Sequence, residues 1–303
     1  LNMNIPALIA APGRTLIIGT LDAGAIKAVF SADFSEMKIH GVYNTGTGLP
    51  ENNIRTLFRD REENLWIGLF NSGLAGVTTN AFSFHRPATN REITFIGRSG
   101  DGLVAGTRNG LMDFNPATGL FSDFRNLSVR TGGSGIASWA ADDSGNLWIG
   151  TVRDGIWVMN SDGTLRQFYL SRNPGQNHIN SVAVEGKNVW LGTSDGVVLL
   201  DRESGTQKAV YTTLDMLPHN YISQVVVNRA GEVLVATKSD MLCYIHVTGG
   251  VRTEGPVMEG SRVNEIRSLS VGADRTICAG TNGNGLFLFA GDQKIEHLNK
   301  DFY

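Results

Sequence analysis

Arginine is the basic residue across a long central stretch of this 303-residue chain. No lysine occurs between Lys38 and Lys187, whereas twelve arginines lie there. A guanidinium group is planar and can donate two parallel hydrogen bonds to a carboxylate or a sulfate. Together, four of them could bind an anion; alternatively, each pairs with a nearby Asp or with water. The four candidates are Arg91, Arg108, Arg130 and Arg153.

A second group of candidate ligand-binding residues combines amide, imidazole and phenol side chains. Polar groups of this kind, interspersed with aromatic rings, suit a polar ligand such as an oligosaccharide. The alternative is structural, because asparagine is also an ordinary turn former. The members of this group are Asn177, His178, His219 and Tyr221.

Signals for catalysis and for metal binding are weak. Residues 192–196 match the nucleophile pattern G-x-S-x-G, but that motif requires a turn from a strand into a helix. Here the match lies in a turn between two apolar strands, which indicates a hairpin. The six histidines are scattered, and no pair has the spacing of metal ligands. We therefore expect no catalytic residue, no metal and no cofactor.

Composition excludes several classes of protein. The net charge of −3 argues against non-specific nucleic-acid binding, which needs a basic face. No apolar run reaches the length of about 18 residues that a membrane helix requires, so we expect no membrane insertion. The 37 glycines exceed the usual share and indicate many turns between short elements.

A repeat of about 43 residues organises the whole chain and positions the candidate residues. Each unit has an apolar strand ending in Gly-Thr or a variant of it, a short polar turn and a second apolar strand. The strand-end positions are Gly19, Gly68, Gly106, Gly150, Gly192, Ala236 and Gly280. An isoleucine lies 13 or 14 residues before each of them: Ile5, Ile54, Ile93, Ile136, Ile179, Ile222 and Ile266.

Each unit is predicted to contain four short strands, as at residues 179–184, 188–193, 196–200 and 208–211. Four antiparallel strands repeated seven times predict an all-β, seven-bladed β-propeller that forms a single domain over residues 1–303. The turn between the second and third strands requires a positive φ at Gly24, Gly73, Gly110, Gly155, Gly196 and Gly285. The sixth unit has Met241 at this position, so we expect an altered turn there.

Ligands of a propeller bind mostly on one face, at the turns between the second and third strands and at the crossings into each first strand. Both groups of candidate residues belong to these turns and crossings. If the first unit begins with its innermost strand, the last blade is complete from the C-terminal end alone. The first and last blades then share no strand and hold together by packing.

The repeat is similar to that of the two-component-regulator propeller family. The unit I-x-x-L-x-x-D-x-x-x-x-L-W-I-G occurs at residues 54–68 and approximately at residues 136–150. The segment Gly-Thr-Gly-Leu-Pro-Glu-Asn-Asn-Ile at residues 46–54 also resembles that family, and residues 217–222 do so more weakly. The resemblance extends along the chain and is strongest in the second, fourth and fifth units.

The resemblance implies a ligand-sensing module on the periplasmic or extracellular face of a bacterial membrane receptor, such as a hybrid histidine kinase. The implied partners are a small polar ligand or oligosaccharide and the output domain of a larger receptor. A homodimer with a second copy of the chain is a further option. The chain would be one propeller of such a receptor or a free-standing relative. Two alternatives stay open: a propeller-fold lyase or hydrolase that uses face histidines, and a protein-interaction scaffold.

Overall fold

A computed structural model of the chain contains almost only β-structure. Three short 3-10 helices are the helices among the described residues: η1 (Thr45–Thr47), η2 (Pro174–Asn177) and η3 (Thr213–Asp215). The structure describes residues 4–32, 36–60, 62–77, 82–87, 92–99, 102–107, 110–124, 134–228, 231–239, 241–246, 250–254, 265–272, 276–290 and 293–298.

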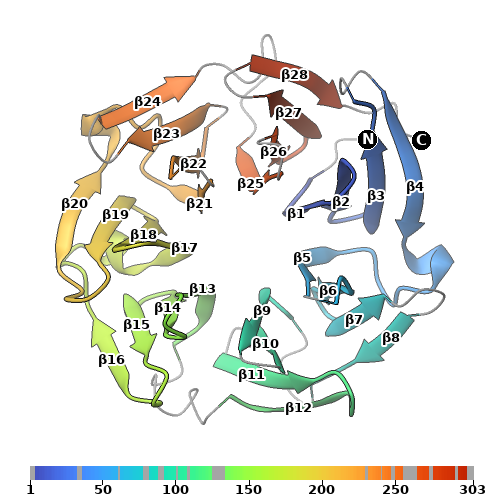
Figure 1. Cartoon of the computed structure of the whole chain (residues 1–303), viewed down its shortest axis with the longest axis horizontal. Helices are drawn as coiled ribbons and strands as arrows, with labels where there is room; N and C mark the ends of the chain where they lie inside the picture. Colours follow the sequence, from blue (N-terminus) through green and yellow to red (C-terminus); the bar gives the residue numbers. More distant parts are fainter. Residues whose placement is uncertain are drawn as a thin grey trace. The chain divides into compact units, whose positions relative to one another are not determined.

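The described residues form seven four-stranded sheets, and the strands of each sheet follow one another in chain order (Figure 1). The fold is a seven-bladed β-propeller with four antiparallel strands per blade, as the repeat predicts. The chain divides into two compact units. The first contains Leu1–Thr107, Met112–Phe124 and Arg267–Tyr303, and the second contains Arg108–Leu111 and Arg125–Ile266. The prediction of one domain over residues 1–303 stays a prediction.

The first unit contains nearly all of four blades. The first blade has β1 (Ala7–Ala11), β2 (Thr15–Gly19), β3 (Ala25–Phe30) and β4 (Met37–Tyr43). The second blade has β5 (Ile54–Arg59), β6 (Leu65–Leu69), β7 (Leu74–Val77) and β8 (Phe82–His85). The third blade has β9 (Phe95–Ser99), β10 (Gly102–Thr107), β11 (Gly110–Asn115) and β12 (Leu120–Asp123). The seventh blade has β25 (Ile266–Val271), β26 (Thr276–Thr281), β27 (Leu286–Ala290) and β28 (Gln293–Leu298).

The second unit contains the fourth, fifth and sixth blades. The fourth has β13 (Ile136–Ala141), β14 (Leu147–Thr151), β15 (Ile156–Met159) and β16 (Leu165–Phe168). The fifth has β17 (Ile179–Glu185), β18 (Asn188–Thr193), β19 (Gly196–Asp201) and β20 (Gln207–Tyr211). The sixth has β21 (Ile222–Val227), β22 (Val233–Thr237), β23 (Leu242–His246) and β24 (Gly250–Glu254).

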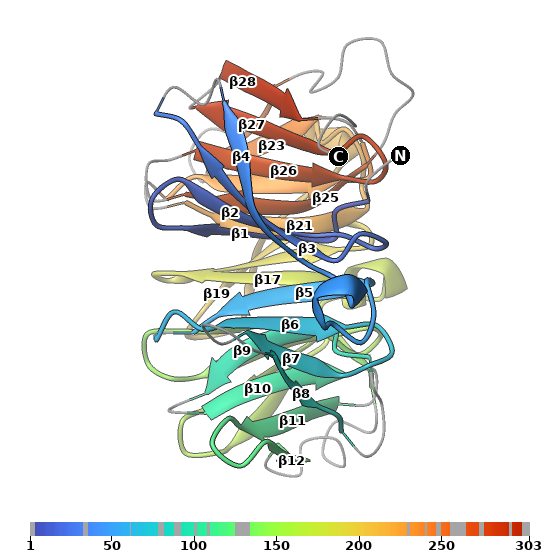
Figure 2. The ribbon, with the colours of Figure 1, turned by 90° about the vertical axis from the view of Figure 1, so that its right-hand side faces the viewer.

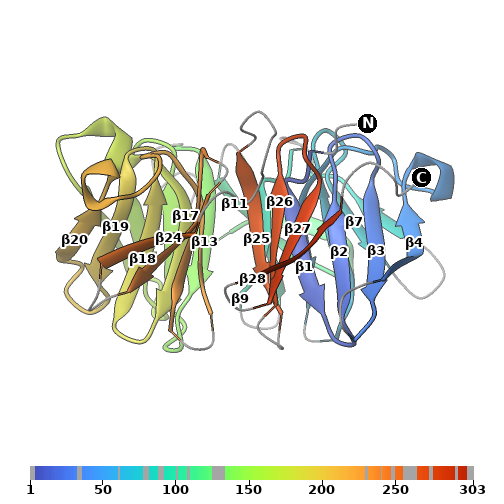
Figure 3. The same ribbon diagram turned by 90° about the horizontal axis from the view of Figure 1, so that it is seen from above.

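The first and seventh blades pack against each other in the first unit, with β25 to β27 beside β1 to β3 (Figure 3). They share no strand, as expected for a first blade that begins with its innermost strand. Hydrogen bonds add to the packing. The amide of Ile5 donates to the carbonyl of Thr281 at 3.0 Å, and the hydroxyl of Ser268 donates to the carbonyl of Ile5 at 2.9 Å.

The core of each unit lies between neighbouring sheets. In the second unit, Trp190 and Leu199 of the fifth blade pack with Val235 of the sixth. The isoleucine that marks each repeat is at most 1% exposed in all seven blades. Both faces of a sheet are therefore apolar, which explains why strict alternation of apolar and polar residues is missing from the sequence.

The Gly-Thr ending of the second strand closes the following turn. The hydroxyls of Thr20, Thr151, Thr193 and Thr281 each donate to the carbonyl of the turn glycine at 2.8 Å. The six glycines predicted to have positive φ all have it. The sixth blade differs, as expected: Thr237 shares a hydrogen bond of 2.8 Å with Ser239, whose Oγ accepts from the amide of Met241 at 3.2 Å.

A hydrogen-bonded aspartate precedes the tryptophan of the second strand in two blades. In the second blade, Asp60 accepts from the indole Nε1 of Trp66 at 2.8 Å and from Nδ2 of Asn64 at 3.0 Å. Burial alone would raise the pKa of Asp60, but these hydrogen bonds hold that pKa below its usual value. Asp142 and Trp148 repeat the contact in the fourth blade. The corresponding Trp190 of the fifth blade follows a shorter turn, and its buried Nε1 has no partner among the described residues.

We expect Trp66→Phe to lower the free energy of unfolding by about 1 kcal/mol more than Trp190→Phe, because only the first change removes a hydrogen bond. Both tryptophans occupy the same position of the second strand and are at most 6% exposed, so the loss of ring volume is similar. Urea denaturation of the two variants measures the difference. A Trp190→Phe cost equal to that of Trp66→Phe would contradict it.

Candidate ligand-binding face

Turns and crossings of successive blades meet at one end of the sheets in the second unit. The amide of Gly155, in the turn before β15, donates to the carbonyl of Asn177 at 3.0 Å. The amide of Gly196, in the turn before β19, donates to the carbonyl of Asn220 at 2.7 Å. We call this surface the loop face. It consists of the turns at residues 152–155, 194–195 and 238–239 and the crossings at residues 169–178 and 212–221.

In three blades, an asparagine two residues before the first-strand isoleucine holds the crossing in place. Oδ1 of Asn177 accepts from the amide of Leu170 at 2.7 Å, and its Nδ2 donates to the carbonyl of Ser171 at 2.6 Å. Oδ1 of Asn220 accepts from the amide of Thr213 at 2.7 Å in the next crossing. In the first unit, Asn52 accepts from the amide of Thr45 at 2.8 Å. Asn177 is 0% exposed, so its side chain supports the crossing from inside the protein and does not reach the surface of the loop face.

Asp195 connects the two crossings of the loop face. Its carboxylate accepts from Nδ2 of Asn220 at 2.8 Å and from Nδ2 of Asn173 in the preceding crossing. Asp195 also belongs to the G-x-S-x-G match. The structure places that match in the hairpin turn between β18 and β19, as expected. The aspartate therefore joins neighbouring blades by hydrogen bonds within the loop face.

Arg153 and His178 are brought together on the loop face. Burial lowers the pKa of the half-buried His178, and the positive charge of Arg153 lowers that pKa further. The imidazole therefore stays neutral to a lower pH than a free histidine. A permanent cation beside a neutral imidazole provides donors for an anionic group.

His219 and Tyr221 lie in the next crossing, and both are exposed. Nδ1 of His219 accepts from the amide of Tyr221 at 2.8 Å. Tyr221 precedes Ile222 as His178 precedes Ile179, so Tyr221 and His178 occupy equivalent positions in neighbouring blades.

Three of the four predicted arginines, Arg91, Arg108 and Arg130, lie outside the described residues. The predicted arginine cluster therefore stays a prediction, with Arg153 as its described member. The predictions for Asn177, His178, His219 and Tyr221 as ligand-binding residues also stay predictions.

Two exposed apolar side chains on the loop face were missed by the sequence reasoning. Leu214 and Met216, in and after η3, are 94% and 71% exposed. The equivalent crossing around η1 has the same capping box and carries Gly46 and Gly48 at these positions. Met216 even adopts the left-handed φ of 75° that Gly48 adopts at 113°. Aligning the two crossings would have shown that the turn does not need these side chains, which leaves them available for contact with another molecule.

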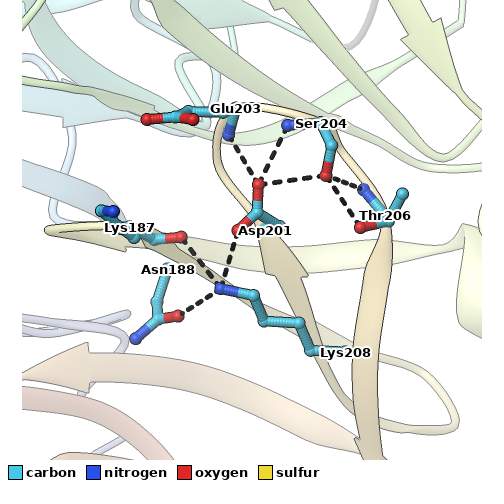
Figure 4. Close-up of polar contacts among 7 residues, drawn as sticks. All are labelled: Lys187, Asn188, Asp201, Glu203, Ser204, Thr206 and Lys208. Carbon is cyan, nitrogen blue, oxygen red and sulfur yellow. Dashed lines mark hydrogen bonds and ion pairs between the residues drawn. The ribbon is translucent and has the colours of Figure 1, made fainter.

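At the opposite end of the fifth blade, charged and polar side chains of the blade contact one another (Figure 4). Nζ of Lys208 contacts Oδ2 of Asp201 at 2.9 Å and donates to Oδ1 of Asn188 at 3.1 Å. Hydrogen bonds from Ser204, together with Lys208, hold the pKa of Asp201 well below its usual value. These groups satisfy one another, so this end has less capacity to bind an anion than the loop face.

The described residues give little support for metal binding or for nucleophilic catalysis. Among the residues that the structure describes, no group of three His, Cys, Asp or Glu side chains is placed to hold a metal ion. Burial raises the pKa of the Cys243 thiol to about 12, so this thiol is not a nucleophile at neutral pH. In the described segments, no helix has the length and apolar character of a membrane span.

The fold and the loop face define a β-propeller with a polar surface made of turns and crossings. Residues 48–71 match the family model described as two component regulator propeller. This match contains the crossing and the first two strands of the second blade, where the sequence resemblance is strongest. The resemblance to that family is thereby confirmed. Comparison with curated protein sequences finds no match.

Solved structures show the same fold. The WD40 β-propeller domain of Doa1 is 12% identical, with a TM-score of 0.71 over 95% of this chain and 93% of that domain. PorZ of Porphyromonas gingivalis, a surface component of the type-IX secretion system, is 12% identical, with a TM-score of 0.71 over 100% of this chain and 39% of PorZ. A protein described as the extracellular domain of a hybrid two-component system, BT4673 of B. thetaiotaomicron, is 17% identical, with a TM-score of 0.50 over 94% of this chain and 45% of that domain. The chain thus spans less than half of the latter two.

Proposed function

We propose that this chain is a ligand-sensing β-propeller of a bacterial signal-transduction receptor and that it acts on the periplasmic or extracellular side of the membrane. The observation that carries the proposal is the match of residues 48–71 to the two component regulator propeller model. A similar fold in the extracellular domain of a hybrid two-component system supports it. In this function the output domain of the receptor is the partner that responds to the ligand, and a homodimer would transmit the change.

The ligand in this proposal is a polar molecule, an oligosaccharide or an anion, that binds the loop face. Arg153 and His178 would contact a negatively charged or hydroxyl-rich group, and Tyr221 would offer its ring. Asn177 would act by holding the crossing that carries His178. Arg108 and Arg130, which belong to the same unit as Arg153, are further candidates for contact with the anion.

A thermal-shift screen tests the proposal. The probes are sulfate, a neutral disaccharide and a disaccharide that contains a uronic acid, each with and without a divalent metal. A ligand at about 100 times its Kd stabilises the folded chain by about 2.7 kcal/mol, which is readily measured. We expect saturable stabilisation without turnover. Turnover that depends on the metal would contradict the proposal and favour a propeller lyase.

Two variants locate the binding. Arg153→Gln should abolish stabilisation by an anion, whereas Arg202→Gln, at the opposite end of the fifth blade, should leave it unchanged. An anion beside Arg153 offsets the charge that lowers the pKa of His178, so binding raises that pKa and becomes tighter as the pH falls toward it. An NMR titration of His178 with and without the anion measures the shift. Equal binding of the anion by both variants would contradict the proposal that the loop face is the binding site.

A further inference from the structure

The third residue after the turn glycine, or after Met241 in the sixth blade, is a core position of the third strand in four blades. It is Val158 in the fourth, Leu199 in the fifth, Tyr244 in the sixth and Leu288 in the seventh blade, each at most 5% exposed. In the first blade this position is Lys27. A cation therefore occupies a place that four other blades fill with a large apolar or aromatic side chain, whereas the second and third blades have Gly76 and Asp113 there.

Lys27 lies on the face of the first blade that packs toward the second. Its neighbours in β3, Ile26 and Ala28, pack on the other face, against residues of the seventh blade. Ile17, which pairs with Lys27 across the sheet, packs with Leu65 of the second blade. The two sheets are neighbours in the first unit, with β1 and β2 next to β5 (Figures 1 and 2).

A cavity of about 750 Å³ is lined in part by Lys27. Residues from both blades line it, among them Ile17, Lys27, Tyr43, Arg59, Leu65 and Val77. The hairpin between β1 and β2 and the turn between β5 and β6 form its mouth. Its lining also includes Tyr43, the residue that precedes the crossing at residues 44–53.

Two cations, Lys27 and Arg59, and two carboxylates, Glu62 and Glu63, are among the residues that line this cavity. Arg59 forms an ion pair with Glu63, and Glu62 pairs with Arg98 at 3.8 Å. Lys27 is partly buried and has no acidic partner among the residues that the structure describes. Lys27 is thus the lining cation without an ion pair among the described residues, and the apolar side chains of Ile17, Leu65 and Val77 belong to the same lining.

We propose that this cavity binds a small organic acid, with the carboxylate on the ammonium group of Lys27 and the apolar part against Ile17, Leu65 and Val77. A carboxylate would give the ammonium group of Lys27 an ion-pair partner, and a charge-assisted hydrogen bond is among the strong ones in proteins. The apolar wall favours an organic acid over an inorganic anion. A volume of this size is typical of small-molecule sites.

The test measures binding of hexanoate to the whole chain by thermal shift and calorimetry. Hexanoate should stabilise the chain saturably, whereas hexanamide, which has the same apolar part but no charge, should bind about tenfold more weakly. In the Arg153→Gln variant, which lacks the proposed anion site of the loop face, sulfate should stabilise the chain less than hexanoate. Stabilisation of this variant by sulfate equal to that by hexanoate, or no stabilisation by hexanoate, would overturn the proposal.

Lys27→Met separates binding from folding. The unbranched apolar side chain fills the core position as in the other blades, so we expect Tm to rise by about 2 °C while hexanoate binding weakens about tenfold or more. Lys27→Arg retains the charge and should retain binding. Lys38→Met, at an exposed lysine of β4, is the matched control and should change neither quantity. Unchanged hexanoate binding in Lys27→Met would overturn the proposal.

Discussion

Replacing Asn177 with alanine is expected to lower the free energy of unfolding by about 3 kcal/mol, because the change removes three side-chain hydrogen bonds from a buried site. Oδ1 accepts from the amide of Leu170 at 2.7 Å, and Nδ2 donates to the carbonyls of Ser171 and Asn173 at 2.6 and 3.1 Å. The alanine side chain offers neither donor nor acceptor, so these three backbone groups lose their hydrogen-bond partner at a site that the crossing covers. Urea denaturation of the variant measures the loss.

Gln176→Ala is the control for this prediction. Gln176 precedes Asn177 in η2, and its side chain is more exposed. Its replacement should change the free energy of unfolding by no more than about 0.5 kcal/mol. If both variants lose the same stability, the crossing is held by its backbone rather than by the amide of Asn177. The Asn177 variant should also loosen the segment that carries His178 and so weaken any ligand on the loop face.

The fold could be predicted from the sequence because its signals are local and repeated. Each isoleucine such as Ile179 begins an innermost strand, and each positive-φ glycine such as Gly196 follows the strand-end threonine by a few residues. The predicted strand at residues 179–184 corresponds to β17 (Ile179–Glu185), and the one at residues 208–211 corresponds to β20 (Gln207–Tyr211). Seven copies of one pattern reduce the ambiguity of any single copy.

The candidate site could be predicted less fully, because its contacts join residues that are far apart in sequence. Asp195 accepts hydrogen bonds from Asn173 and Asn220, which lie 22 and 25 residues away in different crossings. A single blade gives no information on such pairs. The sequence therefore suggested Asn177 as a ligand-binding residue, whereas its burial and its hydrogen bonds appear only when the crossing is folded.

Lys27 illustrates a different limit. A lysine at this position is notable only in comparison with other blades, where the equivalent residues Leu199 and Leu288 are buried. The repeat supplies that comparison once the third strands are aligned from the turn glycine. The cavity beside Lys27 depends on the packing of two blades and has no signal in either blade alone.

Gly155→Ala is expected to destabilise the fourth blade by about 3 kcal/mol or more, which is at the high end for a change of one methyl group. Gly155 has a φ of 70°, and a Cβ atom there would lie 2.4 Å from the carbonyl oxygen of Phe168 and 3.3 Å from Oδ1 of Asn177. The first distance is to backbone, so the end of β16 or the turn must move. The amide of Gly155 would then be drawn away from the carbonyl of Asn177, which it binds at 3.0 Å.

Gly163→Ala separates the clash from the backbone strain. Gly163 belongs to the same blade and has a φ of 83°, but a Cβ atom there meets no atom within 4 Å. Its replacement by alanine therefore costs only the left-handed conformation, about 1 kcal/mol. Equal costs for the two variants, measured by urea denaturation, would contradict the argument. Because Gly155 and Asn177 hold the same crossing, the double variant Gly155→Ala/Asn177→Ala should lose less stability than the two single variants added together.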